Sequence, residues 1–298
     1  MPRFSAGVTT GYRSIENEFL RLEVNGGGAV MMTDKSSGLA YENIDFFEDS
    51  GDVGDEYNYS YPEKDGWFSS SQFVPRVTVA VTGPLRASLK VEHRMVAPKE
   101  AAQDSKSRST EIAEMLVETT FSLSPSARRV DIKTTVHNVC KDHRLRALFS
   151  TGIDTVESYA DTPFAVVHRT HQTYDTTQFP FEHPALVAPM QRFVTIADAC
   201  KGLTLIVKGL PEYELKLDKR GELALTLLRC VGKLSGRDLI TRPGGAAGWW
   251  NETPDAQCLG THTFEYSVVP HKTLDENVWA SILEQVEEFT VPMMSVKR

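Results

Sequence analysis

Residues 114–136, EMLVETTFSLSPSARRVDIKTTV, decide the fold class of this chain. Apolar and polar side chains alternate in residues 114–121 and again in residues 130–136, and the turn signal Ser124-Pro125-Ser126 lies between the two runs. Alternation with a period of two places one face of a strand on a core and the other in solvent, which is typical of antiparallel sheets. The stretch therefore predicts two strands separated by a short turn.

Similar runs and turn signals recur nearer the N-terminus. Residues 78–81 and 87–93 alternate with Thr82-Gly83-Pro84 between them, and Gly26-Gly27-Gly28 follows a further strand-like run. Glycine and proline at such places mark turns between strands. Strands in close succession without intervening helices predict stacked antiparallel sheets. We therefore expect a mostly β fold, a large antiparallel β-sandwich with one C-terminal helix.

Two segments depart from the alternation. Residues 99–110 are charged, small and polar, and we expect a mobile hairpin tip there. Residues 274–289 begin with acids, which the helix dipole favours, and place apolar side chains near helical spacing at Leu274, Val278, Ile282, Leu283, Val286 and Phe289. We expect a helix laid against a sheet edge. Residues 15–290 show no linker and should form one domain between tails at 1–14 and 291–298, with an internal split near residue 160 as the alternative.

Composition excludes several classes of function. The 298 residues are 41% hydrophobic and 24% charged, as in soluble globular proteins. The formal net charge of −8 argues against a nucleic-acid partner and an anionic membrane surface. No run of 18 apolar residues and no apolar leader occurs. The four cysteines, which form no C-x-x-C pair, favour a reducing, cytoplasmic setting with isolated thiols at Cys140, Cys200, Cys230 and Cys258.

The first candidate for function is residues 49–60, DSGDVGDEYNYS. Because unpaired carboxylates are too costly to bury, we expect an exposed loop that presents Asp52 and Asp55 beside the rings of Tyr57 and Tyr59. Carboxylates accept hydrogen bonds from hydroxyls, and aromatic faces pack on the C–H side of a pyranose ring. The segment therefore indicates a sugar-binding loop, and a solvated acidic turn or a calcium-binding loop is the alternative.

The second candidate is residues 234–257, which contain Arg237, Arg242 and a glycine-rich run before Trp249 and Trp250. Paired tryptophans stack on sugars, and the arginine fork suits ligands that carry a carboxylate. The alternative is that the tryptophans anchor the loop by burial. We expect residues 236–252 to meet residues 49–60 at one edge of the sandwich, so that Asp55, Tyr57 and Arg242 border one pocket.

Histidines give a weaker signal. His168 and His171 are three residues apart in a segment with a strand pattern, so their rings should point to opposite faces. We therefore expect no zinc site on these residues.

Short motifs in one fixed order resemble the C-terminal half of glycoside hydrolase family 38, the α-mannosidases and mannosylglycerate hydrolases. Besides the acidic loop, the strand Asp142-His143-Arg144-Leu145-Arg146-Ala147-Leu148-Phe149 resembles a family strand. The other motifs lie at residues 15–24, 26–28, 33–38, 191–194, 201–203, 208–214, 225–229, 236–239, 253–260, 264–266 and 269–271. The resemblance covers about residues 15–290.

The resemblance implies a mutarotase-like supersandwich that serves a retaining α-mannoside hydrolase. In that family a βα barrel and a helical bundle hold the zinc ion, the nucleophilic aspartate and the acid, and nothing in these 298 residues corresponds to them. We therefore expect no catalytic residue, metal ligand or cofactor on this chain, and partners in that barrel and bundle. Substrate contacts are expected from Asp52, Asp55, Tyr57, Tyr59, Arg237, Arg242 and Trp249. Near the acidic loop, apolar surface should be exposed for contact with the barrel.

Two other functions fit this type of sandwich. A stand-alone carbohydrate-binding module needs only the loops. A mutarotase-like sugar epimerase needs a histidine and a glutamate that converge in a concave face, with His143 or His168 and Glu212 or Glu265 as the candidates. Fold alone does not separate these functions.

Overall fold

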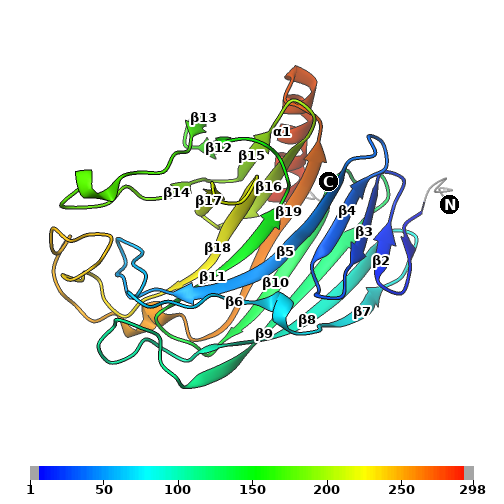
Figure 1. Ribbon diagram of the computed structural model, residues 1–298. Helices are drawn as coiled ribbons and strands as arrows, with labels where there is room; N and C mark the ends of the chain where they lie inside the picture. Colours follow the sequence, from blue (N-terminus) through cyan, green and yellow to red (C-terminus); the bar gives the residue numbers. More distant parts are fainter. Residues whose placement is uncertain (1–6, 292–298) are drawn as a thin grey trace, which may run out of the picture.

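The two strands predicted in residues 114–136 lie side by side in the structure, a computed structural model that describes residues 7–291 (Figure 1). Strand β9 (Ile112–Leu123) pairs antiparallel with β10 (Val130–Asn138), and Val117 lies opposite Val136. Both valines are fully buried. The alternation thus predicted the strands, the turn between them and the face that they bury.

Every strand pair in both sheets is antiparallel. One nine-stranded sheet has the order β13 (Ala165–Thr170), β12 (Glu157–Thr162), β15 (Phe193–Ala197), β16 (Gly202–Lys208), β19 (Gly260–His271), β10, β9, β8 (Ala87–Pro98) and β7 (Arg76–Val81). The predicted strands at 78–81 and 87–93 are β7 and β8.

The other sheet has ten strands. Its order is β1 (Thr9–Thr10), β2 (Ser14–Glu16), β3 (Leu20–Val24), β4 (Val30–Asp34), β5 (Ala40–Gly51), β11 (His143–Ser150), β18 (Glu222–Cys230), β17 (Glu212–Lys216) and β14 (Val187–Pro189), with β6 (Phe68–Ser69) beside β5. Three short 3-10 turns occur at Ser70–Gln72, Thr176–Gln178 and Pro254–Gln257. The expected fold class, a large antiparallel β-sandwich, is confirmed.

The core lies between the facing sheets (Figure 1). Phe47 and Leu145 come from the ten-stranded sheet, Val91 and Phe121 from the nine-stranded sheet, and each is at most 1% exposed. These residues belong to one buried cluster, because the alternating side chains of both sheets point toward each other. Each sheet includes strands from both halves of the chain.

The predicted C-terminal helix is α1 (Glu276–Thr290), whose N-cap is Asp275. The Asp275 side chain accepts a hydrogen bond from the Val278 N–H, 2.8 Å away, as an N-cap should. Ile282 and Val286 are buried against the nine-stranded sheet, in a second cluster with residues of β15, β16 and β19. Leu283, which the apolar spacing also placed in the packed stripe, is 42% exposed.

Two connecting segments have clear physical reasons for their conformation. Gly28 turns β3 into β4 with a φ of +91°, and a Cβ there would lie 2.2 Å from a ring carbon of His93, so the predicted glycine turn is required. Residues 99–110 join β8 to β9 as a hairpin, as predicted. The expectation of a mobile tip is wrong at Arg108, which is 8% exposed and pairs with Asp49 at 2.6 Å, so a buried ion pair anchors the segment.

All four cysteines are free thiols. Within residues 7–291, no helix has both the length and the apolar character that crossing a membrane requires. Of the tails predicted at 1–14 and 291–298, residues 1–6 and 292–298 lie outside the described residues, whereas residues 7–14 include β1, which pairs with β2.

Candidate functional site

Strand β11 is buried on both faces, and its outer face forms the base of the site. Leu145 and Phe149 point into the sandwich core. Arg144 and Arg146 alternate with them, point to the opposite face and are nevertheless only 3% and 1% exposed. Loops from distant parts of the chain cover this face, so the arginines lie at the bottom of a cavity instead of in open solvent.

The cavity has a volume of about 570 Å³, which is within the usual range for small-molecule sites. Its base is formed by neighbouring strands of the ten-stranded sheet, with Arg144 and Arg146 on β11, Arg229 on β18, and Glu212 and Glu214 on β17. The walls come from residues 57–67, residues 173–187 and Thr241. Figure 1 shows these loops gathered at one end of the sandwich.

Aromatic rings dominate the walls of the cavity. The lining includes Tyr57, Tyr59, Tyr61, Trp67 and Tyr174. Tyr57 and Trp67 are 56% and 54% exposed, so both side chains are accessible from solvent. The rings of Tyr59 and Tyr61 lie 6.4 Å apart with their planes tilted by 47°. Apolar ring faces beside charged groups match what a sugar offers, since a pyranose has C–H faces and a rim of hydroxyls.

Arg146 is held between two carboxylates. Its Nη2 atom lies 2.7 Å from Glu48 Oε1, and its Nη1 atom donates to Glu214. Lys216 Nζ lies 3.3 Å from the other oxygen of Glu48. Burial acts to lower the pKa of Arg146, but the two carboxylates outweigh it and raise that pKa. The pair of acids thus fixes a charged guanidinium beside Trp67, whose ring centroid is 5.8 Å from Arg146 Cζ.

Arg229 connects the base of the cavity to the acidic loop. Its Nε atom donates to Asp52 Oδ2 at 2.8 Å, and its Nη2 atom donates to the Asp55 carbonyl at 2.9 Å. The other oxygen of Asp52 accepts from the N–H groups of Gly54 and Ser60 at 3.0 and 3.3 Å. Asp52 therefore shapes the loop from inside and has no exposed surface.

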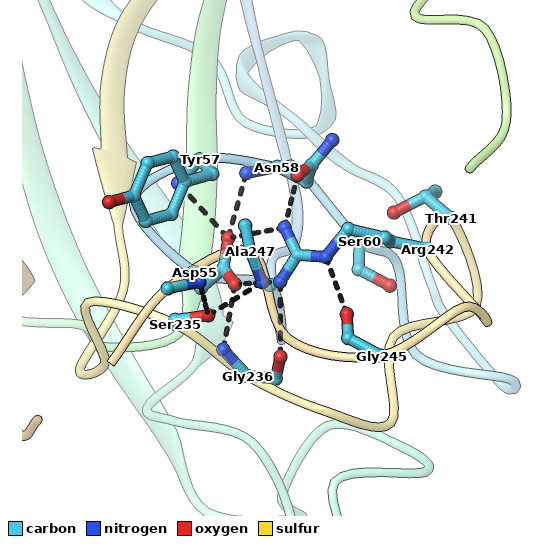
Figure 2. A network of polar contacts seen from close by, with 12 residues as sticks. Asp55, Tyr57, Asn58, Ser60, Ser235, Gly236, Thr241, Arg242, Gly245 and Ala247 are labelled. Atoms are coloured by element: carbon cyan, nitrogen blue, oxygen red, sulfur yellow. Dashed lines mark hydrogen bonds and ion pairs between the residues drawn. The ribbon is translucent and has the colours of Figure 1, made fainter. Parts of the chain in front are cut away.

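Asp55 and Arg242 join the two predicted loops (Figure 2). Arg242 Nη2 donates to Asp55 Oδ2, and the N–H of Gly236 donates to the same oxygen at 2.7 Å. The N–H groups of Tyr57 and Asn58 donate to Asp55 Oδ1 at 3.0 and 2.8 Å. Burial acts to raise the pKa of Asp55, but Arg242 and the backbone donors outweigh it and hold that pKa below its usual value.

All five N–H donors of Arg242 are used inside the protein. Besides Asp55, the guanidinium donates to Asn58 Oδ1, to the Gly245 carbonyl at 2.8 Å and to the Gly236 carbonyl at 3.0 Å. Arg242 is 4% exposed. The two loops do meet at one edge, as predicted, but Arg242 fixes their geometry and has no donor left for a ligand.

The expectation that the acidic loop presents its carboxylates to solvent is wrong. Asp49, Asp52 and Asp55 are all 0% exposed. The reasoning that unpaired carboxylates are too costly to bury still holds, because each of them has a cationic partner from a distant part of the chain. For Asp49 this partner is Arg108, and His143 Nδ1 also lies 2.5 Å from it. The partners could not be identified from the loop sequence.

The structure thus separates the predicted site residues into three groups. Tyr57 and Tyr59 line the cavity. Asp52, Asp55 and Arg242 lie behind its wall and hold the loops in place. Arg237 and Trp249 are exposed and are not part of the lining; Trp249 is 87% exposed. A Cβ on the neighbouring Gly248 would lie 3.2 Å from the Tyr57 hydroxyl, so this loop packs closely against the cavity wall.

Sequence reasoning missed the charged base of the cavity. Arg144 and Arg146 are two residues apart in a strand, and so are Glu212 and Glu214. A spacing of two places each pair on one face of its strand. Charged residues at alternate positions between apolar ones would have indicated that each strand has a polar face. The sequence does not show that this face is buried, because the loops that cover it come from distant parts of the chain.

The histidines proposed for an epimerase lie in structural contacts. His143 is fully buried, and its Nε2 atom lies 3.0 Å from Asn138 Oδ1 while its Nδ1 atom faces Asp49. His168 stacks on Tyr159 and lies 3.3 Å from Glu157. Neither histidine lines the cavity.

The two glutamates proposed for an epimerase lie apart from these histidines. Glu265 pairs with Lys208 at 2.9 Å on the nine-stranded sheet. Glu212 lines the cavity and accepts a hydrogen bond from Thr226 Oγ1 at 2.7 Å. In residues 7–291 no histidine–glutamate contact joins the proposed pairs, so the convergence that an epimerase requires is not found. Nor does this part of the chain contain a group of three or more His, Cys, Asp or Glu side chains that could hold a metal ion.

Comparison with known proteins relates the chain to one domain of glycosyl hydrolases. The family described as "Glycosyl hydrolases family 38 C-terminal domain" matches residues 15–234. A protein of Halalkalibacterium halodurans, provisionally named a mannosylglycerate hydrolase, is 28% identical in an alignment 294 residues long, which covers 93% of this chain and 31% of the relative.

Two solved structures have the same fold over almost the whole chain. An alpha-mannosidase from Enterococcus faecalis V583 is 28% identical with a TM-score of 0.83, and the match covers 97% of this chain and 32% of that protein. A glycosyl hydrolase family 38 protein from Enterococcus faecalis is 27% identical with a TM-score of 0.82, and the match covers 97% of this chain and 34% of that protein. The chain therefore spans about a third of the length of these relatives.

Proposed function

The chain belongs to the glycosyl hydrolase family 38 C-terminal domains, and from this membership we propose that it supplies the carbohydrate-binding wall of an enzyme that cleaves α-mannosides. The observation that carries the proposal is the cavity lined by five aromatic side chains above charged strands. The Halalkalibacterium relative and the Enterococcus α-mannosidase are both named for mannoside hydrolysis, which supports the same substrate class.

In the proposed role, Tyr57 and Trp67 bind the apolar face of a sugar ring and the charged groups below them bind its hydroxyls. Glu212 suits hydroxyl binding, because its only side-chain partner in residues 7–291 is Thr226. The buried pairs of Asp52 with Arg229 and Asp55 with Arg242 keep the aromatic loop in position. We propose these four as positioning residues, while Arg237 and Trp249 contact ligand or another domain at the rim.

The bond-breaking chemistry is assigned to residues outside this chain. A retaining glycosidase needs two carboxyl groups about 5–5.5 Å apart that flank the scissile bond. Asp52 and Asp55 are buried and held by arginines, so neither is open to a substrate. The relatives are about three times as long as this chain, which leaves room for a separate catalytic domain. We also propose a cytoplasmic location.

Exposed apolar side chains near the cavity suit contact with such a domain. Phe181 and Leu186 are 75% and 53% exposed, and Trp249 and Trp250 are 87% and 56% exposed. Their loops touch, because the Gly244 N–H donates to the Phe181 carbonyl at 2.8 Å. Surface of this kind marks interaction sites. It lies beside the acidic loop, where we expected the barrel to dock.

The proposal is tested by binding and turnover with the 298-residue chain. Methyl α-mannoside should bind, as measured by calorimetry, and an aryl α-mannoside should not be hydrolysed with or without added zinc. Trp67→Ala should weaken binding about ten-fold, since an aromatic contact with a ligand contributes on the order of 1 kcal/mol or more. Tyr12→Ala, which removes an exposed ring (87%) on another part of the surface, is the control. Zinc-dependent turnover by this chain, or mannoside binding that Trp67→Ala leaves unchanged, would contradict the assignment.

A further inference from the structure

Cys230 and Cys258 are far apart in the sequence, and the fold brings them together. Cys230 is the last residue of β18 and is fully buried, whereas Cys258 follows the 3-10 turn Pro254–Gln257 and is half-buried. The Val231 N–H donates to the Ala256 carbonyl at 3.2 Å and joins the two segments. The Cys258 side chain packs against the buried cluster that contains Cys230. The expectation of isolated thiols is therefore wrong for this pair.

The side chain of Asn138 connects the two cysteines. Its Oδ1 atom accepts a hydrogen bond from the Cys140 N–H at 3.0 Å, which fixes the orientation of the amide. Its Nδ2 atom lies 3.4 Å from Cys230 Sγ and 2.9 Å from the Cys258 carbonyl oxygen. Asn138 is only 2% exposed. One buried side chain thus holds the sulfur of one cysteine beside the backbone of the other.

The two thiols differ in reactivity. A hydrogen bond from the Cys230 thiol, together with the nearby charges of His262 on β19 and His143 on β11, outweighs burial and lowers the pKa of Cys258 to about 6. The same contact and burial raise the pKa of Cys230. The thiolate is the reactive form of a cysteine. Cys258, which solvent also reaches, is therefore the nucleophile, and Cys230 stays a thiol beside it.

The pair lies at the two ends of a loop that shapes the cavity. Residues 231–257 connect the two cysteines and carry Arg242, which binds Asp55 in the acidic loop. The same segment packs against the cavity wall at Tyr57. A covalent bond between Cys230 and Cys258 closes this loop at its base.

We propose that Cys230 and Cys258 form a site of reversible oxidation, at which a hydroperoxide converts the two thiols into a disulfide. In the first step the Cys258 thiolate attacks a peroxide oxygen, the O–O bond breaks and hydroxide leaves, so the sulfur is oxidised to a sulfenic acid and the peroxide is reduced. In the second step the Cys230 sulfur attacks Cys258 Sγ, the S–O bond breaks, and the hydroxide leaves with the Cys230 thiol proton as water.

The inference is independent of the proposed carbohydrate-binding function. Disulfides in the cytoplasm are usually transient and catalytic or redox-sensing, so a reversible bond fits the location proposed above. The disulfide also limits the freedom of the unfolded chain, and the oxidised protein should therefore unfold at a higher temperature than the reduced one.

The test treats the Cys200→Ser variant of the 298-residue chain with one equivalent of hydrogen peroxide. The substitution removes an exposed thiol that could link two copies, and it leaves three of the four cysteines. Thiol titration in denaturant should then fall from three thiols to one. Peptide mapping should find residues 230 and 258 in one linked fragment, and dithiothreitol should restore both thiols.

Two further variants in the same background identify the pair. Cys258→Ser should keep its remaining thiols reduced, because Cys230 and Cys140 are both buried. Cys140→Ala, which removes a buried thiol outside the pair, should still form the linked fragment. Circular dichroism establishes that each variant is folded before oxidation.

The pH dependence of alkylation tests the assigned nucleophile. The rate at which iodoacetamide labels Cys258 should reach half its maximum at a pH of about 6. In Cys230→Ala this midpoint should move upward, because the hydrogen bond to the thiolate is lost. An unchanged midpoint would mean that the two thiols do not interact.

The disulfide is overturned by any of three results. One is peroxide treatment that leaves residues 230 and 258 unlinked, with Cys258 oxidised beyond the sulfenic acid and Cys230 still a thiol. Another is oxidation that consumes the same number of thiols in Cys258→Ser as in its parent. The third is loss of the linked fragment in folded Cys140→Ala, which would assign the bond to a different pair.

None of these measurements uses a sugar, so their failure leaves the carbohydrate-binding proposal untouched.

Discussion

At the scale of single residues, Asp45 shows how the core modifies a carboxyl group. Asp45 is 1% exposed, and its Oδ1 atom accepts a hydrogen bond from the Tyr266 hydroxyl at 2.6 Å. No partner for its Oδ2 atom is present in residues 7–291. Burial raises the pKa of this carboxyl to about 7, and the hydrogen bond from Tyr266 only partly opposes the effect. The carboxyl is therefore protonated in the folded protein over a range in which the unfolded chain has lost that proton.

We predict that Asp45→Asn removes a pH-dependent loss of stability. The pKa of Asp45 is higher in the folded protein than in the unfolded chain. Its contribution to the free energy of unfolding is therefore fully present below its ordinary pKa and is lost as the pH rises toward 7. Asn keeps an acceptor for Tyr266 and tolerates the φ of +59° at this position. Urea unfolding should give similar stabilities for variant and wild type at pH 4. At pH 8 the variant should be more stable by on the order of a few kcal/mol. If the difference in stability between variant and wild type were the same at pH 4 and at pH 8, a raised pKa for Asp45 would be contradicted.

The ion pair of Arg242 with Asp55 gives a second prediction at this scale. Arg242→Ala leaves a fully buried carboxylate without its cation, so it should lower the free energy of unfolding by about 3–5 kcal/mol at pH 7. The pKa of Asp55 is lower in the folded protein than in the unfolded chain. Its contribution to the free energy of unfolding is therefore present above the ordinary pKa and is lost as the pH falls through the pKa of the folded state. The penalty should therefore shrink as the pH falls below the ordinary pKa of 3.8.

Arg237→Ala is the matched control, because Arg237 is exposed on the same loop. Its effect on the free energy of unfolding should stay within about 0.5 kcal/mol. A similar loss of stability in both variants would mean that the loop tolerates no truncation at all, and that the buried pair has no special role.

At the scale of elements, α1 follows the sequence pattern more closely than the acidic loop does. The acids at its start and its apolar spacing are local features, and they predicted the element and most of its buried face. The conformation of residues 49–60 depends on Arg108, Arg229 and Arg242, none of which is near in sequence. Local patterns therefore predicted the elements, while the loops of the site required long-range partners.

The packing of α1 leads to a third prediction. Ile282→Ala should lower the free energy of unfolding by about 2–5 kcal/mol, because Ile282 is 1% exposed and packs in the cluster between helix and sheet. Leu283→Ala changes the next residue, which is 42% exposed, and should have a much smaller effect. Chemical denaturation of both variants measures the difference. Equal effects would show that the helix does not pack on the sheet through the face described.

At the scale of the whole molecule, both sheets share one core, and each contains strands from both halves of the chain. We therefore propose that residues 15–290 unfold as one unit. Trp67 beside the ten-stranded sheet and Trp279 on α1 report on opposite sides of the sandwich. Their fluorescence and the circular dichroism signal should change in a single coincident transition on heating. Two separated transitions would instead support a division into subdomains.

The sequence by itself determined the class of the fold, because the alternation, the turn residues and the helical spacing of apolar side chains act over a few residues and need no knowledge of distant contacts. The ordered motifs also indicated the family, which the comparisons confirm. The site was predicted in part: Tyr57 and Tyr59 line the cavity, whereas the carboxylates of the same segment do not.

Only the tertiary structure decided which charges are exposed. A carboxylate in a sequence favours solvent, but Asp52 and Asp55 meet Arg229 and Arg242, and the ion pairs make their burial tolerable. Arg144 is buried because loops fold over its strand, and the ring of Tyr59 from one of these loops lies 3.6 Å from its Cζ atom. Burial and pairing depend on residues that are more than 80 positions apart in the chain, and no local pattern encodes such partners.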